Sequence, residues 1–190
     1  TSGEVPINQY RIIWDLMNNV ERANTIITHD AGSPRDQLVP FWETVAPRTY
    51  MGWGKSTQLG YGLGITMGAK LAEPDKLCIN IMGDAAIGMV GMDIETAARY
   101  KIGILTIIFN NGVMAMERKT MPYAADTYDS ILQRGDYRKL AEALGGWAMR
   151  VEQPDEFVTA LKQAIKVTET GQPALLDCIV KEGYDLSVFE

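Results

Sequence analysis

Two short polar segments, each directly after an apolar run, carry the side chains best suited to chemistry in this sequence. The run over residues 77–82 is followed by Gly-Asp-Ala-Ala, which contains Asp84, and the run over residues 104–109 by Asn-Asn-Gly, which contains Asn111. Both runs have the length and composition of buried strands. In a parallel α/β sheet, ligands bind beyond the carboxyl ends of the strands. We therefore expect Asp84 and Asn111 to lie at one ligand-binding edge.

Asp84 offers a carboxylate and Asn111 an amide carbonyl, and both are hard oxygen donors that suit Mg²⁺ or Ca²⁺ rather than Zn²⁺. Mg²⁺ usually takes one or two carboxylates and completes its shell with water and phosphate oxygens. The small residues Ala85 and Ala86 would let backbone N–H groups approach an anion at the start of the next helix. The pair predicts a metal that holds a phosphorylated ligand. The simpler alternative is an aspartate that only caps a helix and an Asn-Gly that only makes a turn.

A third segment of turn-forming residues, from His29 to Pro34, follows the apolar residues 25–28. The same argument assigns it to the ligand edge, where Gly32 could offer an N–H group and Ser33 a hydroxyl to a phosphate. His29 is the only histidine of the chain. Histidine is the usual acid–base residue near neutral pH, but a single histidine is more often a structural hydrogen-bonding side chain than a catalyst.

A glycine-rich segment in the middle of the chain resembles two nucleotide-binding motifs without completing either. Gly54-Lys55-Ser56 looks like the end of a P-loop, but the required glycine five residues before Gly54 is replaced by Thr49. Gly60 and Gly62 could begin a dinucleotide-binding fingerprint, but the position of its third glycine is occupied by Ile65. We interpret these glycines as sites where a helix or a ligand approaches the backbone closely.

The spacing of the two polar segments resembles the signature of thiamine-diphosphate-dependent enzymes, in which Gly-Asp-Gly precedes Asn-Asn by some two dozen residues. In this chain 24 residues separate Gly83-Asp84-Ala85 from Asn110-Asn111. The resemblance implies that Asp84, Asn111 and the carbonyl of Val113 bind Mg²⁺, which grips the diphosphate of the cofactor. It implies that the cofactor-binding residues are Gly32, Ser33, Leu59, Gly83, Asp84, Ala85, Ala86, Asn111, Val113 and Met114.

Two further segments support the resemblance, and one residue departs from it. The glycine-rich run that ends at Leu59 and the pattern over residues 136–145 are similar to the family. In the family a bulky apolar residue at the position of Leu59 supports the bent cofactor; the alternative for Leu59 is an ordinary core residue. Ala85 stands where the family usually has glycine. If that turn requires a left-handed backbone, alanine would be disfavoured and the diphosphate would be held differently.

The elements that must position these residues alternate along the chain. Strands are expected at residues 25–28, 48–51, 77–82, 104–109, 147–151 and 174–180. Helices are expected at residues 9–22, 59–71, 88–100, 136–144 and 154–168. This alternation predicts a three-layer α/β/α fold with a mainly parallel sheet of about six strands. Residues 112–135 have little periodicity and are expected to form a functional loop, in which Met114 and Met116 either line a substrate pocket or simply pack.

Composition narrows the class of protein. The 190 residues suit one domain, and a hydrophobic content of 46% is enough for a sizeable core. The net charge of −6, with scattered basic residues, argues against a nucleic-acid-binding surface. No apolar run approaches the ~18 residues that a membrane-spanning helix needs. Cys78 and Cys178 lie in apolar runs and are expected to be buried free thiols of a cytoplasmic protein.

The resemblance implies the C-terminal, diphosphate-binding domain of a lyase or carboligase of the acetolactate synthase or oxalyl-CoA decarboxylase type. Such an enzyme acts on 2-oxo acids or related acyl substrates. In the family the activating glutamate lies on a separate pyrimidine-binding domain, usually from a neighbouring subunit, which implies a homodimer or homotetramer. No catalytic residue is then expected in this chain, and the chain alone is expected to be inactive.

Residues 1–190 are interpreted as one domain, with residues 1–6 as a linker to a missing upstream region. Two alternatives to the thiamine reading stay open. One is a Mg²⁺-dependent nucleotide-binding α/β domain, against which the incomplete P-loop weighs. The other is a non-catalytic regulatory subunit that keeps the fold, which the alanine at position 85 favours and the presence of both Asp84 and Asn111 opposes.

Overall fold

Six parallel strands form one sheet in the computed structural model, which describes residues 2–52, 54 and 58–183. Their order across the sheet is β2-β1-β3-β4-β6-β5, and every neighbouring pair is parallel. The strands are β1 (Thr25–His29), β2 (Tyr50–Met51), β3 (Leu77–Gly83), β4 (Leu105–Asn110), β5 (Trp147–Val151) and β6 (Ala174–Ile179). The predicted parallel sheet of about six strands is therefore confirmed.

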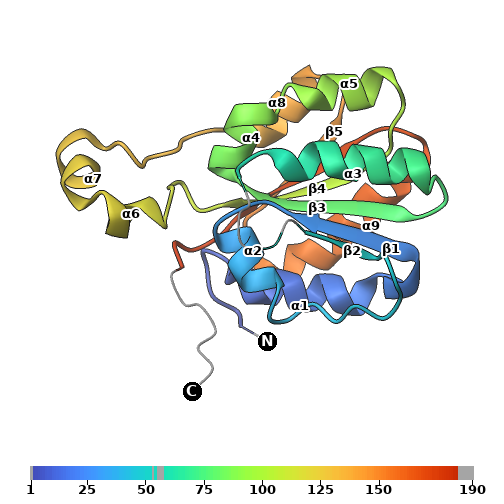
Figure 1. The fold of residues 1–190 in the computed structure, drawn as a ribbon, viewed down its shortest axis with the longest axis horizontal. Coiled ribbons are helices and arrows are strands. Elements are labelled where there is room, and N and C mark those ends of the chain that lie inside the picture. The colour runs from blue at the N-terminus through green and yellow to red at the C-terminus, as the bar shows by residue number, and fades with distance from the viewer. Residues whose placement is uncertain (1, 53, 55–57, 184–190) are drawn as a thin grey trace.

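Helices cover both faces of the sheet (Figure 1). One layer consists of α1 (Gln9–Asn19), α2 (Ser33–Leu38) and α9 (Phe157–Glu169). The opposite layer consists of α3 (Tyr61–Ala72), α4 (Asp84–Val90), α5 (Asp93–Arg99) and α8 (Tyr137–Ala143). Short 3-10 turns lie at Arg22–Asn24 and Pro154–Glu156. Two further short helices, α6 (Glu117–Thr120) and α7 (Pro122–Tyr128), project from the body of the fold (Figure 1).

Each strand contributes to two cores because successive side chains point to opposite faces of the sheet. In β3, Ile79 and Ile81 belong to the core under α1 and α9, whereas Cys78 and Met82 belong to the core under α3, α4, α5 and α8. With both faces covered, the strands read as continuous apolar runs rather than as alternating patterns. This explains why composition and length, not periodicity, identified them in the sequence.

The two cysteines are buried and free, as predicted. Cys78 lies in one core and Cys178 in the other, so the sheet separates the two thiols and prevents a disulfide between them. Burial raises the pKa of the Cys78 thiol to about 11 and that of Cys178 well above its ordinary value. Both side chains therefore act as small apolar core residues.

The predicted helix over residues 88–100 is wrong in its extent, because two helices, α4 and α5, occupy this part of the chain. Helix α4 begins at Asp84, directly after β3, with Gly83 in an extended conformation as its N-cap residue. The break lies at Gly91 and Met92. Glycine within a helix is unfavourable by about 1 kcal/mol relative to alanine. Asp84 consequently occupies the first turn of a helix and not a loop.

The sequence also failed to predict three short helices, α2, α6 and α7. Helix α2 begins beside Pro34, a residue well suited to a first helical turn, but it is too short for a hydrophobic period to be visible. Helices α6 and α7 lie in the segment 112–135 that was interpreted as a loop. Their few buried residues explain the missing pattern, since Ala125 is the buried residue of α7 and α6 has none.

Three expectations remain, on membrane-spanning helices, on the apparent P-loop and on the first residues of the chain. No described helix is long and apolar enough to cross a membrane. Lys55 and Ser56, the residues that looked like the end of a P-loop, lie outside the described residues. Residues 1–6 stay a predicted linker, and the next residue, Ile7, forms a parallel bridge with Val180 beside β6.

Candidate functional site

The carboxyl ends of β1, β3 and β4 meet at one edge of the sheet. The backbone N–H of Asp30, which follows β1, donates to the carbonyl of Ile81 in β3 at 2.8 Å. At the end of β3, Gly83 is the direct partner of Phe109 in β4. The chain leaves β1 toward β2 on one side and returns to β3 on the other, and ligands bind at such switch points in open α/β sheets.

Asp84 and the turn that contains Asn111 are joined by a direct hydrogen bond. The backbone N–H of Gly112 donates to Oδ2 of Asp84 at 2.7 Å, and the N–H of Ala85 donates to Oδ1 of Asp84 at 2.9 Å. The Asn111 Oδ1 atom accepts the N–H of Val113 at 3.1 Å. Gly112 has a φ of +75°, which explains the glycine in the Asn-Asn-Gly sequence. The predicted oxygen donors from β3 and β4 are thus neighbours.

A cavity of about 380 Å³ opens at this edge. All of the cofactor-binding residues predicted from the sequence line it: Gly32, Ser33, Leu59, Gly83, Asp84, Ala85, Ala86, Asn111, Val113 and Met114. They come from the segments that follow β1, β3 and β4 and from the residues before α3. The tertiary structure therefore brings the whole predicted set to one cavity, while the binding role of each residue stays a prediction.

The segment over residues 112–135, called the arm below, folds back so that its two ends lie side by side. Gln133 donates its N–H to the carbonyl of Gly112, and Met114 donates to the carbonyl of Ile131, both at 2.8 Å. These bonds flank an antiparallel bridge between Val113 and Leu132. No described backbone N–H donates to the carbonyl of Val113. Val113 itself lines the cavity.

The donors suit a hard cation with oxygen ligands. The Asp84 side chain is buried, and desolvation, the largest effect, raises its pKa to about 6. Hydrogen bonds from the backbone N–H groups of Gly112, Ala85 and Asp84 itself act in the opposite direction by stabilising the carboxylate. The described residues contain no group of three or more His, Cys, Asp or Glu side chains able to hold a metal. One carboxylate, one amide oxygen and one backbone carbonyl would leave room for the water and phosphate oxygens that Mg²⁺ prefers.

Ala85 causes no backbone conflict at this site. It lies in the first turn of α4 and is absent from the non-glycine residues with positive φ, which are Arg48, Lys101 and Asp129 among those described. The expected difficulty with alanine at a left-handed turn therefore does not arise. The N–H of Ala85 is already engaged by Asp84, so this amide is not available to an anion without a rearrangement.

The cavity also contains charged and polar residues that sequence reasoning missed: Arg35, Asp36, Gln58 and Glu117. Arg35 and Asp36 lie in α2 and form an ion pair at 2.5 Å. They follow the predicted turn directly, so extending that segment past Pro34 would have found them. Glu117 begins α6, where the chain gave no periodic signal. Met116, which was weighed as a pocket residue, does line the cavity.

His29 does not line this cavity. The side chain is buried at the end of β1, with Nδ1 at 3.1 Å from the carbonyl of Asp30 and 3.4 Å from the hydroxyl of Tyr61. Burial, the largest effect, lowers the pKa of His29. Its ring also packs against Tyr50, with centroids 5.5 Å apart. These surroundings favour a structural role for His29.

A buried polar cluster beside the cavity holds the start of α3. Asp30 accepts the N–H of Gly60 at 2.5 Å, and burial, which outweighs that bond, raises the pKa of Asp30 to about 6. Gly62 lies against the same cluster: a Cβ atom there would lie 2.5 Å from Oδ1 of Asn80 and 2.9 Å from Oδ2 of Asp30. The glycine thus permits a close approach of α3 to the strands, and Leu59 precedes it at the cavity.

Replacing Gly62 with alanine is expected to lower the free energy of unfolding by about 1–3 kcal/mol, which lowers the melting temperature by roughly 3–10 °C. The cause is the overlap of the new methyl group with Asn80 and Asp30. The matched control is Gly64→Ala in the same helix, where nothing lies within 4 Å of the new Cβ. Thermal unfolding followed by circular dichroism measures both variants. Equal melting temperatures for the two would contradict the packing argument.

Comparison with known proteins gives one matching family. A family model described as "Thiamine pyrophosphate enzyme, C-terminal TPP binding domain" matches residues 30–178. A probable acetolactate synthase large subunit of Methanococcus aeolicus is 32% identical, covering 97% of this chain and 32% of that protein. A 2-hydroxyacyl-CoA lyase of Oryza sativa subsp. japonica is 36% identical, covering 70% of this chain and 24% of that protein. The chain thus spans about a third or less of the length of these relatives.

Proposed function

The chain belongs to the family of C-terminal TPP-binding domains of thiamine pyrophosphate enzymes, and from this we propose that it holds the diphosphate of thiamine diphosphate through Mg²⁺. Asp84, Asn111 and the backbone carbonyl of Val113 are the proposed metal ligands. The observation that carries the proposal is the convergence of these donors on one cavity, with Asp84 bonded to the turn that contains Asn111. When bound, the cofactor supplies an electron-accepting thiazolium ring, and the protein supplies position and charge.

The other lining residues have roles that follow from their chemistry. Gly32 and Ser33 would contact the diphosphate with an N–H group and a hydroxyl. Gly83 and Ala86 have little or no side chain, which leaves room for the diphosphate beside the first turn of α4. Leu59 and Met114 present apolar side chains to the same cavity, and Leu59 would support the bent conformation of the cofactor. None of these residues is proposed to exchange a proton or form a covalent bond with substrate.

We place the chain within an acetolactate synthase-like lyase or carboligase, acting on 2-oxo acids or related acyl substrates. The names of the relatives, a synthase and a 2-hydroxyacyl-CoA lyase, support this class. The chain matches only about a third of the acetolactate synthase relative. We therefore propose that a pyrimidine-binding domain, from a neighbouring subunit of a homodimer or homotetramer, supplies the activating glutamate. The two reduced, buried thiols suit the cytoplasm that we expect for this enzyme.

A calorimetric titration with thiamine diphosphate tests the proposal. We expect binding heat in the presence of Mg²⁺ and none with EDTA, because the diphosphate and Asp84 would otherwise repel each other. A nucleoside triphosphate added in excess should not displace the cofactor. Displacement by the nucleotide would favour the nucleotide-binding alternative, and absence of binding in the complete enzyme would favour the non-catalytic one. Without its partner domain the chain should show no decarboxylation or carboligation.

A further inference from the structure

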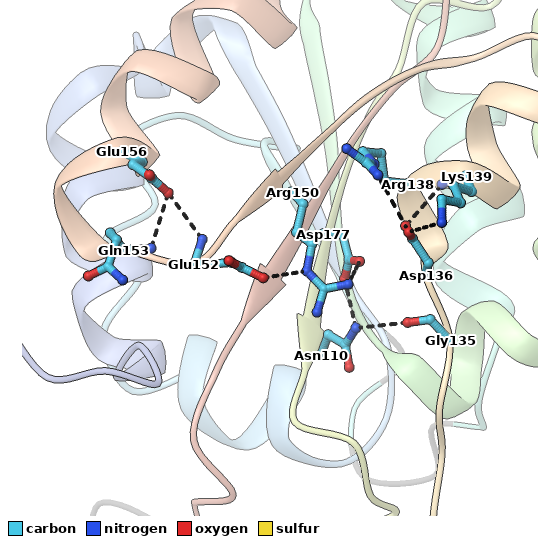
Figure 2. Close-up of polar contacts among 10 residues, drawn as sticks. All are labelled: Asn110, Gly135, Asp136, Arg138, Lys139, Arg150, Glu152, Gln153, Glu156 and Asp177. Carbon is cyan, nitrogen blue, oxygen red and sulfur yellow. Dashed lines mark hydrogen bonds and ion pairs between the residues drawn. The ribbon is translucent and has the colours of Figure 1, made fainter.

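A fully buried carboxyl group lies behind the proposed metal site. Asp177, in the middle of β6, has no exposed surface and does not line the cavity. Its Oδ1 atom accepts a hydrogen bond from Nδ2 of Asn110 at 2.9 Å (Figure 2). Its Oδ2 atom makes no hydrogen bond to the described residues, and Nη1 of Arg150 lies 3.9 Å away. Asn110 is thus the main hydrogen-bonding partner of Asp177, and Arg150 and the backbone N–H of Tyr137 stabilise the carboxylate less.

Burial of the Asp177 carboxyl group inside the sheet costs free energy. Except for Asp177, strand β6 is built of apolar residues and Cys178, and it lies between β4 and β5 with helices on both faces. Burying an ionisable group costs free energy unless strong partners compensate, and an apolar side chain of similar volume is often as stable. Compensation from Arg150 is incomplete, because its Nε atom is paired with Glu152 at 2.9 Å (Figure 2). Stability alone therefore gives little reason for an aspartate at this position.

The partner of Asp177 joins two segments of the site. Asn110 is the last residue of β4 and directly precedes Asn111. Its amide also reaches the carbonyl of Gly135 at 3.5 Å, at the end of the arm and two residues before α8 begins (Figure 2). On the cavity side of the same turn, Asp84 accepts the N–H of Gly112. The turn from Asn110 to Gly112 is therefore held at both ends, by Asp177 from inside the sheet and by Asp84 from the cavity.

We propose that Asp177 is a positioning residue for the metal site: by holding the Asn110 side chain, it fixes the turn that presents Asn111 to the metal. This inference rests on the proposed function. It gives Asn110 a role distinct from that of its neighbour, because Asn111 would contact the metal while Asn110 binds to the sheet. Residues that orient metal ligands typically change metal affinity about 10- to 100-fold when they are removed.

The test is a titration of the complete enzyme with Mn²⁺ at saturating thiamine diphosphate. Mn²⁺ prefers the same octahedral oxygen coordination as Mg²⁺, and electron paramagnetic resonance counts the free ion directly, without any need for turnover. Asp177→Leu keeps a similar volume and removes the acceptor. We expect its dissociation constant for Mn²⁺ to rise about 10- to 100-fold. Asp177→Asn retains an oxygen that can accept from Asn110 and should keep most of the affinity.

Two further variants separate positioning from general structure. Thr106→Val removes a buried hydroxyl from β4 without touching the turn, and it should bind Mn²⁺ like the wild type. Asn110→Ala breaks the same bond from the other side, so it should weaken binding by a factor comparable to that of Asp177→Leu. The double variant should be no weaker than either single one, because the two side chains act through one bond. If Asp177→Leu fails to fold, Asn110→Ala with its Thr106→Val control decides the question.

The failures of the two proposals are distinguishable. If the wild type binds Mn²⁺ with thiamine diphosphate and either Asp177→Leu or Asn110→Ala binds it equally well, the positioning role is wrong and the proposed function stands. A lower melting temperature with unchanged Mn²⁺ affinity would have the same meaning, because it would assign Asp177 to structure alone. If the wild-type enzyme binds no Mn²⁺ in the presence of the cofactor, the proposed function is wrong and this inference falls with it.

Discussion

Replacing Asp84 with alanine is expected to abolish Mg²⁺-dependent binding of thiamine diphosphate. Asp84 is the only carboxylate in the proposed ligand set, so its loss should weaken binding by at least about 100-fold, beyond the cost of removing a residue that only orients a ligand. The variant should also lose the bond to the N–H of Gly112, which loosens the turn that carries Asn111. Calorimetric titration in Mg²⁺, compared with the wild type, measures the effect.

The matched control for this prediction is Asp93→Ala. Asp93 likewise lies in the first turn of a helix that follows β3 along the chain, but it is exposed and does not line the cavity. The control should bind the cofactor like the wild type. The folded state of Asp84→Ala should persist, because a buried carboxylate with a raised pKa is removed rather than introduced. Unchanged Mg²⁺-dependent binding by Asp84→Ala would exclude Asp84 as a ligand.

Replacing Gly103 with alanine is expected to have the largest effect on stability. Gly103 lies between α5 and β4, where the chain passes the end of α9. A Cβ atom there would lie 1.9 Å from the carbonyl oxygen of Thr168 and 3.1 Å from Cα of Gly171. Both contacts are with backbone atoms, which cannot move aside as a flexible side chain would. We expect a loss of about 3 kcal/mol or more in the free energy of unfolding.

Chemical denaturation compares Gly103→Ala with its control, Gly68→Ala. Gly68 lies on the exposed side of α3, and nothing lies within 4 Å of a Cβ atom added there. Alanine should therefore leave stability unchanged or raise it by up to about 1 kcal/mol, because it favours the helix. Both variants add one methyl group, which meets backbone atoms at Gly103 and open space at Gly68. Similar denaturation midpoints would mean that the backbone around Thr168 is much more adaptable than its packing indicates.

The sequence alone determined the fold class and the placement of Asp84 and Asn111 at one edge of the sheet. The apolar runs were long enough to be strands, and their alternation with helical segments required a parallel sheet. Once the sheet is parallel, the ends of β1, β3 and β4 must lie at the same edge. Asp84 and Asn111 therefore become neighbours although 26 residues lie between them in the chain. Short-range patterns and the geometry of a parallel sheet were sufficient for this part of the prediction.

The tertiary structure alone decided how that edge is built. Three parts of that edge could not be read from the sequence. The start of α4 at Asp84 and the helix α6 that begins at Glu117 are too short to show a hydrophobic period. The same holds for the short helix α2, in which Arg35 and Asp36 form their ion pair. The bond between Asp177 and Asn110 joins residues 67 positions apart in the chain. Nothing local to either residue indicates it, since pairing across a sheet depends on strand order and register. The order β3-β4-β6 puts the end of β4 beside Asp177, and this long-range packing gives both residues their place behind the site.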